Sequence, residues 1–398
     1  MLLHAAFWCS LLVLFFTYFG YPLLLILLAP FWRRSPAAAT AAIEPAVSII
    51  VPVRDESSHA ESKLRNCAQI DYPPEKTEIL VIDDGSADDT LERVEAARQE
   101  VGKNGRRLRV ISLGNRLGKA AAVNRGAREA GGEILVFSDA DTLVSSASVR
   151  SLVAPFADPS VGCVAGRYVP GGARGRNAGG LGLYWRYENF LRLKESQMGG
   201  LLGASGALYA VRKRLYVPLD ANLINDDFVV PMNVTAQGYR SVYEPSAEAI
   251  EDASQTELEF SRRVRIMAGN CQHLWMFRHL ALRPSQWRTA FLLFCHKFLR
   301  VISPFWMAGL AASNAALLAA ESSPEWLRFL YRGAFGLQVL FYTLALAGCL
   351  TRKRKSPASR LVALPYYFAM IHVAALWGIC RFFFRRAQVP WSAQPVHR

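Results

Sequence analysis

The stretch Ile134-Leu-Val-Phe-Ser-Asp-Ala-Asp141 decides the fold that we predict for this chain. Its first four residues are apolar and typical of a buried strand, and two carboxylates follow where that strand ends. An isolated Asp-x-Asp is most often a solvated turn. Directly after a strand, however, Asp139 and Asp141 can hold a hard divalent cation, Mg²⁺ or Mn²⁺, that bridges phosphate oxygens. We therefore predict a metal-bound diphosphate at this strand end.

Short apolar segments alternate with polar, alanine-rich segments around this stretch. Strands are predicted at 47–53, 78–82, 108–112 and 134–137, and helices at 58–69, 87–100 and 119–130. This alternation implies right-handed βαβ crossovers and an α/β domain with a mostly parallel, Rossmann-like sheet. Ligands of such sheets bind at the carboxyl ends of the strands, so we expect the chemistry directly after each strand.

Further acids follow the first two strands. Glu56 comes after the first, Asp83 and Asp84 come after the second, and four acids stand within seven residues there. A carboxylate at these points can accept hydrogen bonds from a base edge or a ribose hydroxyl, and Gly85 allows a sharp turn beneath the ligand. Capping of the following helix would explain one or two of these acids. Their number favours a nucleotide site.

Basic residues that could meet a diphosphate occur at two places. Lys119 begins a predicted helix, where a cation is unfavourable for the helix dipole but well placed beside a phosphate. Arg262 and Arg265 are three residues apart, on one face of another predicted helix. A guanidinium suits diphosphate recognition, but these arginines could equally face anionic lipids. The residues alone leave both interpretations open.

Asp226 and Asp227 precede a predicted helix and are the candidates for a catalytic base. Sugar transfer that inverts the anomeric centre needs a carboxylate to take the acceptor proton while the hydroxyl attacks in line. Helix capping would also explain this pair of acids. We prefer Asp227 to Asp226 as the base.

Residues 5–32 carry no charge and are long enough to cross a hydrocarbon core of about 30 Å. A signal peptide is the alternative, but it needs a basic n-region and a shorter apolar run. Arg33 and Arg34 follow the run, so the positive-inside rule predicts an anchor with the next domain in the cytoplasm. We thus expect a multi-pass protein of the cell inner membrane.

Composition predicts the remaining organisation. Seven glycines and three arginines in 166–182 indicate a mobile loop, and 183–195 resembles an amphipathic helix. An interfacial helix is predicted at 287–298. Crossings are predicted at 301–320, 329–350 and 361–379. Four crossings would place the arginines of the tail on the outer side of the membrane, against the positive-inside rule. The last segment is therefore re-entrant or interfacial, or else the tail violates that rule. The predicted domains are an N-terminal transmembrane helix (1–34), a catalytic domain (43–280), an interfacial helix (284–300) and C-terminal transmembrane helices (301–384).

Cysteine and charge content exclude other classes. The seven scattered cysteines contain no Cys-x-x-Cys pair, which argues against a zinc site or a disulfide framework. The formal net charge of +14 could indicate nucleic-acid binding. Many arginines, however, lie beside apolar segments or among glycines, so membrane lipids and a diphosphate ligand explain the charge without nucleic acid.

Several motifs follow one another along the chain: the strand-end acids, Asp83-Asp-Gly-Ser86, the Gly-Lys segment, Ser138-Asp-Ala-Asp141, Asp226-Asp-Phe and the arginine cluster. Taken in this order, they resemble the motifs of family 2 glycosyltransferases of the GT-A fold. That family contains the cellulose, hyaluronan and chitin-type synthases. The resemblance covers about residues 47–272, and the flanking helices also look like those of membrane synthases. The predicted site residues are Asp227 as the base, Glu56, Asp83, Asp84, Lys119, Asp139 and Arg265 for the nucleotide sugar, Gly206, Asp226 and Arg262 on the acceptor side, and Asp139 and Asp141 for the metal.

One motif departs from the family. Its synthases usually carry Gln-x-x-Arg-Trp near the end of the domain, and this chain has Arg262-Arg-Val-Arg265-Ile266. In the family that tryptophan packs against the acceptor sugar, so Ile266 argues against processive polymer synthesis. Asp226 also stands where many members have Glu, a change of little mechanistic weight.

These features predict an inverting transferase whose donor is a nucleotide-diphosphate sugar, a UDP-sugar. The acceptor is a saccharide or a lipid-linked molecule, and the reaction belongs to polysaccharide biosynthesis. A single, non-processive transfer to a lipid-linked acceptor is the alternative. A non-catalytic scaffold would have lost a metal or base carboxylate, and a nucleotidyltransferase would carry a Gly-rich loop after the first strand. The sequence retains these carboxylates and has no Gly-rich loop at that position.

Overall fold

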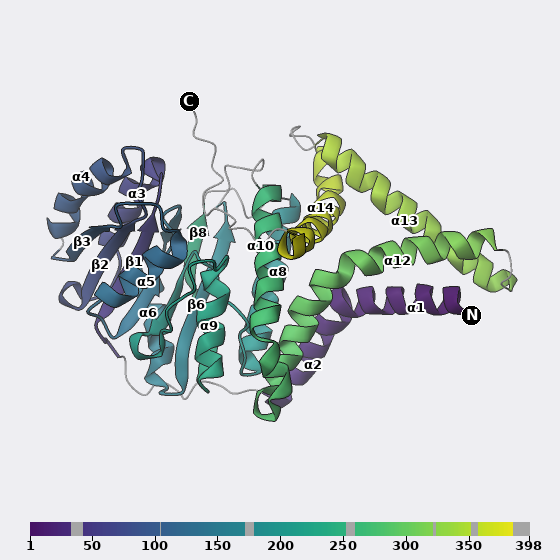
Figure 1. The fold of residues 1–398 in the computed structure, drawn as a ribbon, viewed down its shortest axis with the longest axis horizontal. Helices are drawn as coiled ribbons and strands as arrows, with labels where there is room; N and C mark the ends of the chain where they lie inside the picture. Colours follow the sequence, from purple (N-terminus) through teal and green to yellow (C-terminus); the bar gives the residue numbers. More distant parts are fainter. Residues whose placement is uncertain are drawn as a thin grey trace.

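The computed structural model describes residues 1–32, 43–103, 105–171, 179–251, 259–320, 324–351 and 357–384. It consists of an α/β domain and an arm of long helices that extends to one side (Figure 1). The N-terminus lies at the far end of this arm.

One eight-stranded sheet forms the centre of the α/β domain, in the order β3-β2-β1-β4-β7-β6-β8-β5. The parallel half contains β1 (Val47–Val53), β2 (Thr77–Asp83), β3 (Arg107–Ser112) and β4 (Ile134–Phe137). The mixed half contains β5 (Thr142–Val144), β6 (Val161–Pro170), β7 (Tyr209–Arg212) and β8 (Arg240–Glu251). The four strands predicted from sequence are confirmed within a residue at each end.

Helices cover both faces of this sheet, because successive residues of a strand point to opposite faces. Ile49 and Val51 of β1 belong to one core, and Ile50 belongs to another. The first core is covered by α3 (Ser57–Ala68), α4 (Thr90–Lys103) and α6 (Ser148–Val153), and the second by α5 (Lys119–Glu129) and α9 (Asp226–Ala236). The second core also includes Tyr21 and Leu25, so the α/β domain and the N-terminal helix share one apolar interior.

The glycine-rich segment differs from the prediction. Strand β6 continues through Gly166 to Pro170, and α8 (Gly179–Gln197) begins within the range that we expected to be a loop. Gly166 suits the strand because a Cβ there would lie only 2.7 Å from the Ala247 carbonyl oxygen of β8. Composition indicated a loop, but pairing with β8 determines the structure. The rest of the predicted loop, 172–178, lies outside the described residues.

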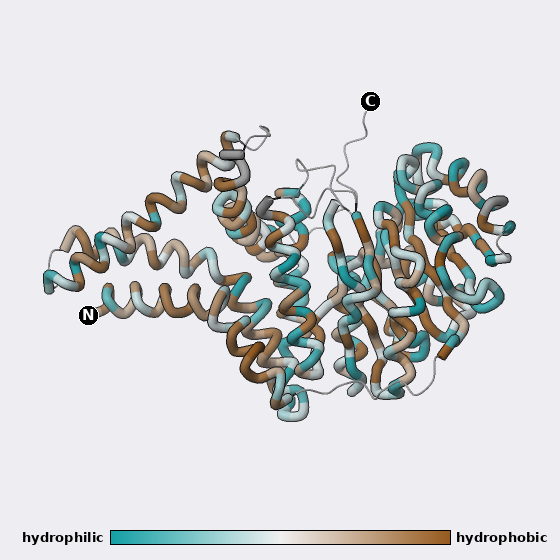
Figure 2. The backbone as a smooth tube through the Cα atoms, turned by 180° about the vertical axis from the view of Figure 1, so that it is seen from behind, coloured by the Kyte–Doolittle hydropathy of each residue, from teal (hydrophilic) through white to brown (hydrophobic). Residues whose placement is uncertain are grey.

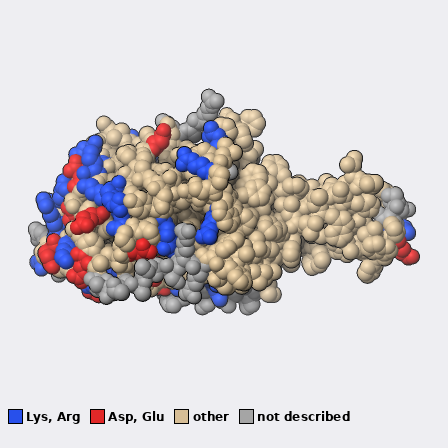
Figure 3. Space-filling view, turned by 90° about the horizontal axis from the view of Figure 1, so that it is seen from below, with Lys and Arg blue, Asp and Glu red and all other residues tan. Residues whose placement is uncertain are grey.

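The arm consists of the apolar segments that the sequence predicts to cross the membrane (Figure 2). In the part of the chain that the structure describes, four helical segments are long and apolar enough to do so: Leu2–Trp32, Pro284–Ala319, Glu325–Thr351 and Leu361–Phe384. On the face in Figure 3, Lys, Arg, Asp and Glu gather on the α/β domain, whereas the arm is nearly free of them except at its far end. This distribution fits an arm surrounded by lipid.

The second of these segments differs from the prediction in its boundary. The helix α11 (Trp287–Leu292), a π-helical stretch η7 (Leu293–Phe298) and α12 (Leu299–Ala319) follow one another without interruption. No helix ends at residue 300, because the chain contains neither Gly nor Pro from Trp287 to Ser303. The predicted interfacial helix, which we expected to lead into the bilayer, thus continues without interruption into the predicted crossing.

The last helix packs against the α/β domain as well as the arm (Figure 1). The relevant elements are α10 (Glu259–Met276), α13 (Glu325–Thr351) and α14 (Pro357–Phe384). Gly378 of α14 lies so close to α10 that a Cβ there would be 2.7 Å from Met267 Cβ. Arg263 of α10 lies 5.6 Å from the ring centroid of Tyr367. The described end of the chain is thus joined to the helix that carries Arg262 and Arg265.

Candidate active site

The predicted acids of β2 lie buried at the carboxyl edge of the sheet. Asp83 accepts a hydrogen bond from Ser112 Oγ at 2.9 Å, and Asp84 accepts them from the backbone amides of Leu117 and Gly118 at 2.6 and 2.9 Å. These carboxylates hold the loop after β3 in place. Their contact with a nucleotide stays a prediction.

Capping explains the next two acids. Asp88 Oδ1 accepts a hydrogen bond from the Thr90 amide at 3.1 Å, and its Oδ2 accepts one from the Ser57 amide at 3.2 Å. Asp89 forms an ion pair with the first turn of α4. The chain makes the expected sharp turn at Gly85, whose φ is +70°. Asp88 and Asp89 therefore stabilise the beginnings of the neighbouring helices.

Lys119 brings two of the predicted site acids together. Its Nζ lies 2.7 Å from Asp139 Oδ1 and 3.2 Å from Asp226 Oδ1. Burial lowers the pKa of Lys119, but the two carboxylates outweigh burial and raise it, so the amine stays protonated. Gly206 approaches the same point, since a Cβ there would lie 2.6 Å from Asp139 Oδ2. Residues from α5, β4, α9 and the loop before β7 thus converge.

Asp226 and Asp227 have different surroundings. Asp226 is buried, with Tyr209 Oη donating to its Oδ2 at 3.0 Å and Lys119 facing its other oxygen. Asp227 Oδ2 accepts a hydrogen bond from the Gly206 amide at 3.0 Å. Burial, and then the charge of Asp226, raise the pKa of Asp227. A raised pKa increases the affinity of a carboxylate for a proton, as a general base requires.

Asp141 lies in a region of excess negative charge. Burial, and then the carboxylates of Glu251, Asp139 and Glu56, raise the pKa of Asp141 to about 7. Such a region fits a divalent cation, for which carboxylate oxygens are suitable ligands. Within the described residues no group of three or more His, Cys, Asp or Glu could hold a metal ion. The assignment of Asp139 and Asp141 as metal ligands stays a prediction.

The two predicted arginines are on α10 but have different partners. Arg262 donates two hydrogen bonds to Glu251, at 2.6 and 3.1 Å. Burial, and then Arg262, lower the pKa of Arg265, whereas Asp139 and Asp227 act in the opposite direction. Arg262 interacts electrostatically with Asp139 and Asp141, whereas Arg265 interacts with Asp139, Asp226 and Asp227. The two arginines therefore face different parts of the group of acids.

Our sequence reasoning missed Lys63, which lies behind the Asp-x-Asp turn. This side chain of α3 is buried, and its Nζ donates to Ser138 Oγ at 2.6 Å and to the Thr142 carbonyl oxygen at 2.7 Å. These two residues flank Asp139 and Asp141, so one amine holds both ends of the turn. Lysines are rarely buried, and only its spacing on the apolar face of α3 could have indicated this role.

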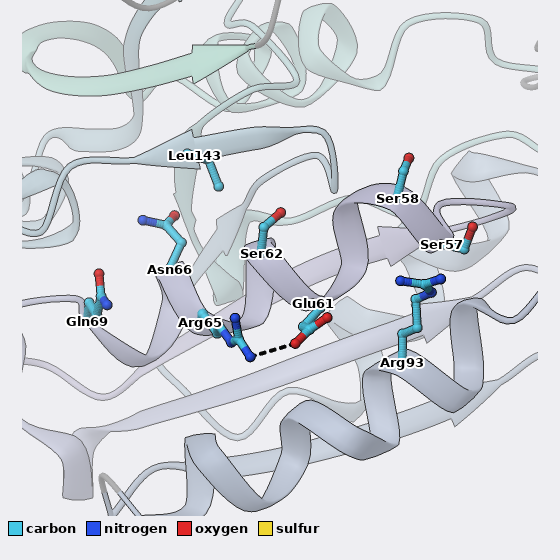
Figure 4. A pocket seen from close by; sticks show the side chains of 9 residues that line it. All are labelled: Ser57, Ser58, Glu61, Ser62, Arg65, Asn66, Gln69, Arg93 and Leu143. Atoms are coloured by element: carbon cyan, nitrogen blue, oxygen red, sulfur yellow. Dashed lines mark ion pairs between the residues drawn. The ribbon is translucent and has the colours of Figure 1, made fainter.

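Two surface pockets are lined by none of the predicted site residues. The pocket in Figure 4, about 350 Å³ in volume, is lined by side chains of α3, α4 and β5, among them the ion pair of Arg65 with Glu61. A second pocket of about 720 Å³ lies between the end of β3 and α5 and is lined by Asn124 and Tyr216. The candidate site is therefore defined by the convergence of charged groups.

A mixed α/β sheet with an Asp-x-Asp, a lysine and paired acids at one edge is the arrangement expected of a glycosyltransferase of the GT-A type. Residues 48–217 match the family model described as glycosyl transferase family 2, and residues 134–380 match glycosyl transferase family group 2. The second match covers more than half of the chain. The chain therefore belongs to the family 2 glycosyltransferases and is an enzyme of that class.

Curated relatives match about half of the chain. It is 28% identical over 211 residues to poly-beta-1,6-N-acetyl-D-glucosamine synthase of Staphylococcus aureus, which is 50% of this chain and 48% of the relative. It is 28% identical over 225 residues to an N-acetylglucosaminyltransferase of Bradyrhizobium diazoefficiens, 52% and 45% of the two chains. The chain thus spans about half the length of these relatives.

A solved structure matches nearly the whole chain. It is the mannosyltransferase PcManGT from Pyrobaculum calidifontis in complex with GDP-Man and Mn²⁺, 25% identical, with a TM-score of 0.71. The similarity covers 97% of this chain and 100% of that one, so it includes the helical arm. The GT-A prediction is confirmed, and use of a divalent metal is supported.

Proposed function

We propose that the chain transfers a sugar, with inversion, from a UDP-sugar to a saccharide or lipid-linked acceptor at the cytoplasmic face of the inner membrane, in polysaccharide biosynthesis. The observation that carries this proposal is the meeting of Asp139, Asp226 and Lys119, with Asp227 beside them. One region then offers a site for a diphosphate and a carboxylate base.

In this proposal Asp227 accepts the proton of the acceptor hydroxyl as its oxygen attacks the anomeric carbon. The bond between that carbon and the diphosphate oxygen breaks, and the electron pair leaves with the diphosphate. Lys119 and Arg265 offset the negative charge of the leaving group. A cation held by Asp139 and Asp141 would supply further positive charge to the diphosphate.

The nucleotide of the donor has two candidates. The relatives named for N-acetylglucosamine transfer favour a UDP-sugar, in agreement with the sequence prediction. The similarity to a mannosyltransferase bound to GDP-Man extends over nearly the whole chain and favours a GDP-sugar as the second candidate.

The number of transfers also has two candidates. Similarity to a named polysaccharide synthase favours repeated addition. Ile266, in place of the tryptophan that packs against the acceptor sugar in related synthases, favours a single transfer to a lipid-linked acceptor.

Nucleotide release tests this function. The detergent-purified chain would be supplied with UDP- and GDP-sugars, membrane lipids, and Mg²⁺, Mn²⁺ or EDTA, and the product would be sized. We expect release from one donor, dependent on the metal. A long product identifies a processive synthase, and an adduct of one sugar on lipid identifies the single transferase. Release from no donor in either series would overturn the proposal.

A further inference from the structure

A buried group of charged side chains joins α8 to the segment that leads into α12. Glu195 and Glu188 of α8 face His296, with Nδ1 2.5 Å from Glu195 Oε1 and Nε2 3.4 Å from Glu188 Oε2. Arg300 forms an ion pair with Glu188, and Tyr21 Oη donates to Glu195 at 2.6 Å. Both glutamates are buried. The α/β domain and the arm therefore meet through charged groups as well as apolar ones.

This group contains more positive than negative charge. Lys297 interacts electrostatically with Glu188, Glu195, Arg192 and Arg300. Three cations thus accompany two carboxylates, even with the histidine neutral. We call these residues the interface cluster: Glu188, Arg192, Glu195, His296, Lys297 and Arg300. Buried cations are stable only when an anion or hydrogen-bond acceptor compensates them.

Several donors of the interface cluster have no acceptor in the described part of the chain. Buried atoms without a hydrogen-bond partner there are Arg192 Nη1 and Arg300 Nε and Nη2. Unpaired buried donors are rare in folded proteins, and a ligand rich in acceptor oxygens would pair them.

The interface cluster borders the proposed catalytic base. Arg192 Nη2 donates to the Ala204 carbonyl oxygen at 3.1 Å, and the Ala204 amide donates to the Asp227 carbonyl oxygen at 2.8 Å. Lys297 Nζ lies 5.5 Å from the ring centroid of Phe228. Lys297 belongs to η7, and such π-helical turns occur frequently at functional sites. The excess positive charge is therefore next to the base, where the chain enters the arm.

We infer that the interface cluster binds the phosphate or diphosphate group of a lipid-linked acceptor, while the acceptor hydroxyl reaches Asp227. A neutral saccharide would leave the cations and their donors unpaired, whereas phosphate oxygens match both charge and hydrogen-bonding capacity. The location at the entry to the arm allows the lipid chain to remain in the bilayer. This inference rests on the proposed function and specifies its acceptor class.

Binding of dodecyl phosphate to the full chain in a neutral detergent tests the inference, with dodecanol and inorganic phosphate as comparison ligands. Lys297→Gln and Arg192→Gln are expected to raise the Kd of dodecyl phosphate at least about tenfold, a loss of one charge-assisted contact each. Lys297→Arg should retain binding. The matched controls on α8, Lys194→Gln and Arg186→Gln, should stay within about twofold of the unaltered chain. Donor nucleotide binding in every variant reports that the protein is folded.

Three results would overturn the inference: equal binding of dodecanol, equal binding of inorganic phosphate alone, or equal loss of affinity in the controls. Displacement of dodecyl phosphate by phosphatidylglycerol at the same mole fraction would identify a bulk headgroup site and would also overturn it. The proposed function fails separately, if the unaltered chain releases no nucleotide from any donor. A neutral product made with nucleotide release would leave that function standing and reject only the phosphate site.

Discussion

One protonated amine organises the candidate site at the scale of single residues. Lys119 compensates Asp139 and Asp226, which come from separate elements of the chain. Burial raises the pKa of Asp139, but Lys119 outweighs it and lowers that pKa, whereas the pKa of Asp227 is raised. Two carboxylates whose pKa values differ in this way can take different roles. The one with the lower pKa stays ionised and binds positive charge, and the one with the higher pKa can accept a proton.

Replacement of Asp227 by Asn should reduce kcat about 10²–10⁴-fold, the usual contribution of a general base. Donor affinity should stay within about twofold, because the amide conserves the shape of the side chain. Turnover and donor Kd are the measurements, with Asp220→Asn as a matched surface control. Retained turnover would transfer the base role to Asp226.

The pH profile should show the raised pKa of Asp227. A base acts when deprotonated, so activity is expected above this pKa and lost as the pH falls through it, at a higher pH than the ordinary aspartate value of about 3.9. Asp226→Asn removes the neighbouring negative charge that helps to raise the pKa of Asp227, so the acid limb of kcat/KM should move to lower pH. An unchanged limb would show that another group determines it.

Asp141→Ala should abolish the increase in nucleotide affinity that Mn²⁺ or Mg²⁺ causes. The measurement is nucleotide binding with metal and with EDTA. Asp88→Ala is the control, because that acid caps helices and should alter stability without altering metal dependence. Equal metal dependence in Asp141→Ala and the unaltered chain would reject Asp141 as a ligand.

At the scale of elements, the contact of α14 with α10 is the long-range feature that composition did not indicate. Arg263 lies 4.7 Å from the ring centroid of Tyr184 on α8 and 5.6 Å from that of Tyr367 on α14, and Tyr367 Oη donates to Glu259 at 3.1 Å. Three helices thus share one buried guanidinium beside Arg262 and Arg265. The position of α14 is therefore coupled to the arginines of the site.

Gly378→Leu should disturb this contact, since even a Cβ would lie 2.7 Å from Met267 Cβ. We expect a loss of about 1–3 kcal/mol in the free energy of unfolding, as in other overpacked sites, seen as a lower Tm in detergent. The control is Gly333→Leu on α13, where a Cβ meets nothing within 4 Å. Equal Tm values for the two variants would contradict the docking of α14.

At the scale of the whole molecule, apolar and charged surfaces are segregated. Within the described residues, the long apolar segments lie to one side of the sheet (Figure 2). On the face in Figure 3, the charged side chains gather on the α/β domain. The core that reaches from Ile50 to Tyr21 makes the two parts continuous. In the proposed function, this continuity holds the candidate site close to the bilayer that contains a lipid-linked acceptor.

The proposed orientation can be tested by cysteine labelling. In a chain whose exposed cysteines, Cys9, Cys349 and Cys380, are replaced by Ser, Glu325→Cys is expected to react with a membrane-impermeant maleimide in intact cells. Arg65→Cys on the α/β domain should react only after permeabilisation. Both positions are exposed, so a reversed pattern would show the opposite orientation.

The sequence by itself determined the strands of the parallel half, the helices between them, the edge where the acids lie and the apolar segments. These follow from periodicity and strand-end position, which are local properties. Only the tertiary structure decided that Lys119 meets Asp139 and Asp226, that Lys63 supports the Asp-x-Asp turn, that β6 extends through the glycines, and that α14 packs on α10. Each is a contact between segments distant in the chain, and depends on packing that no local pattern encodes. The interface cluster has the same origin, because about a hundred residues separate α8 from η7.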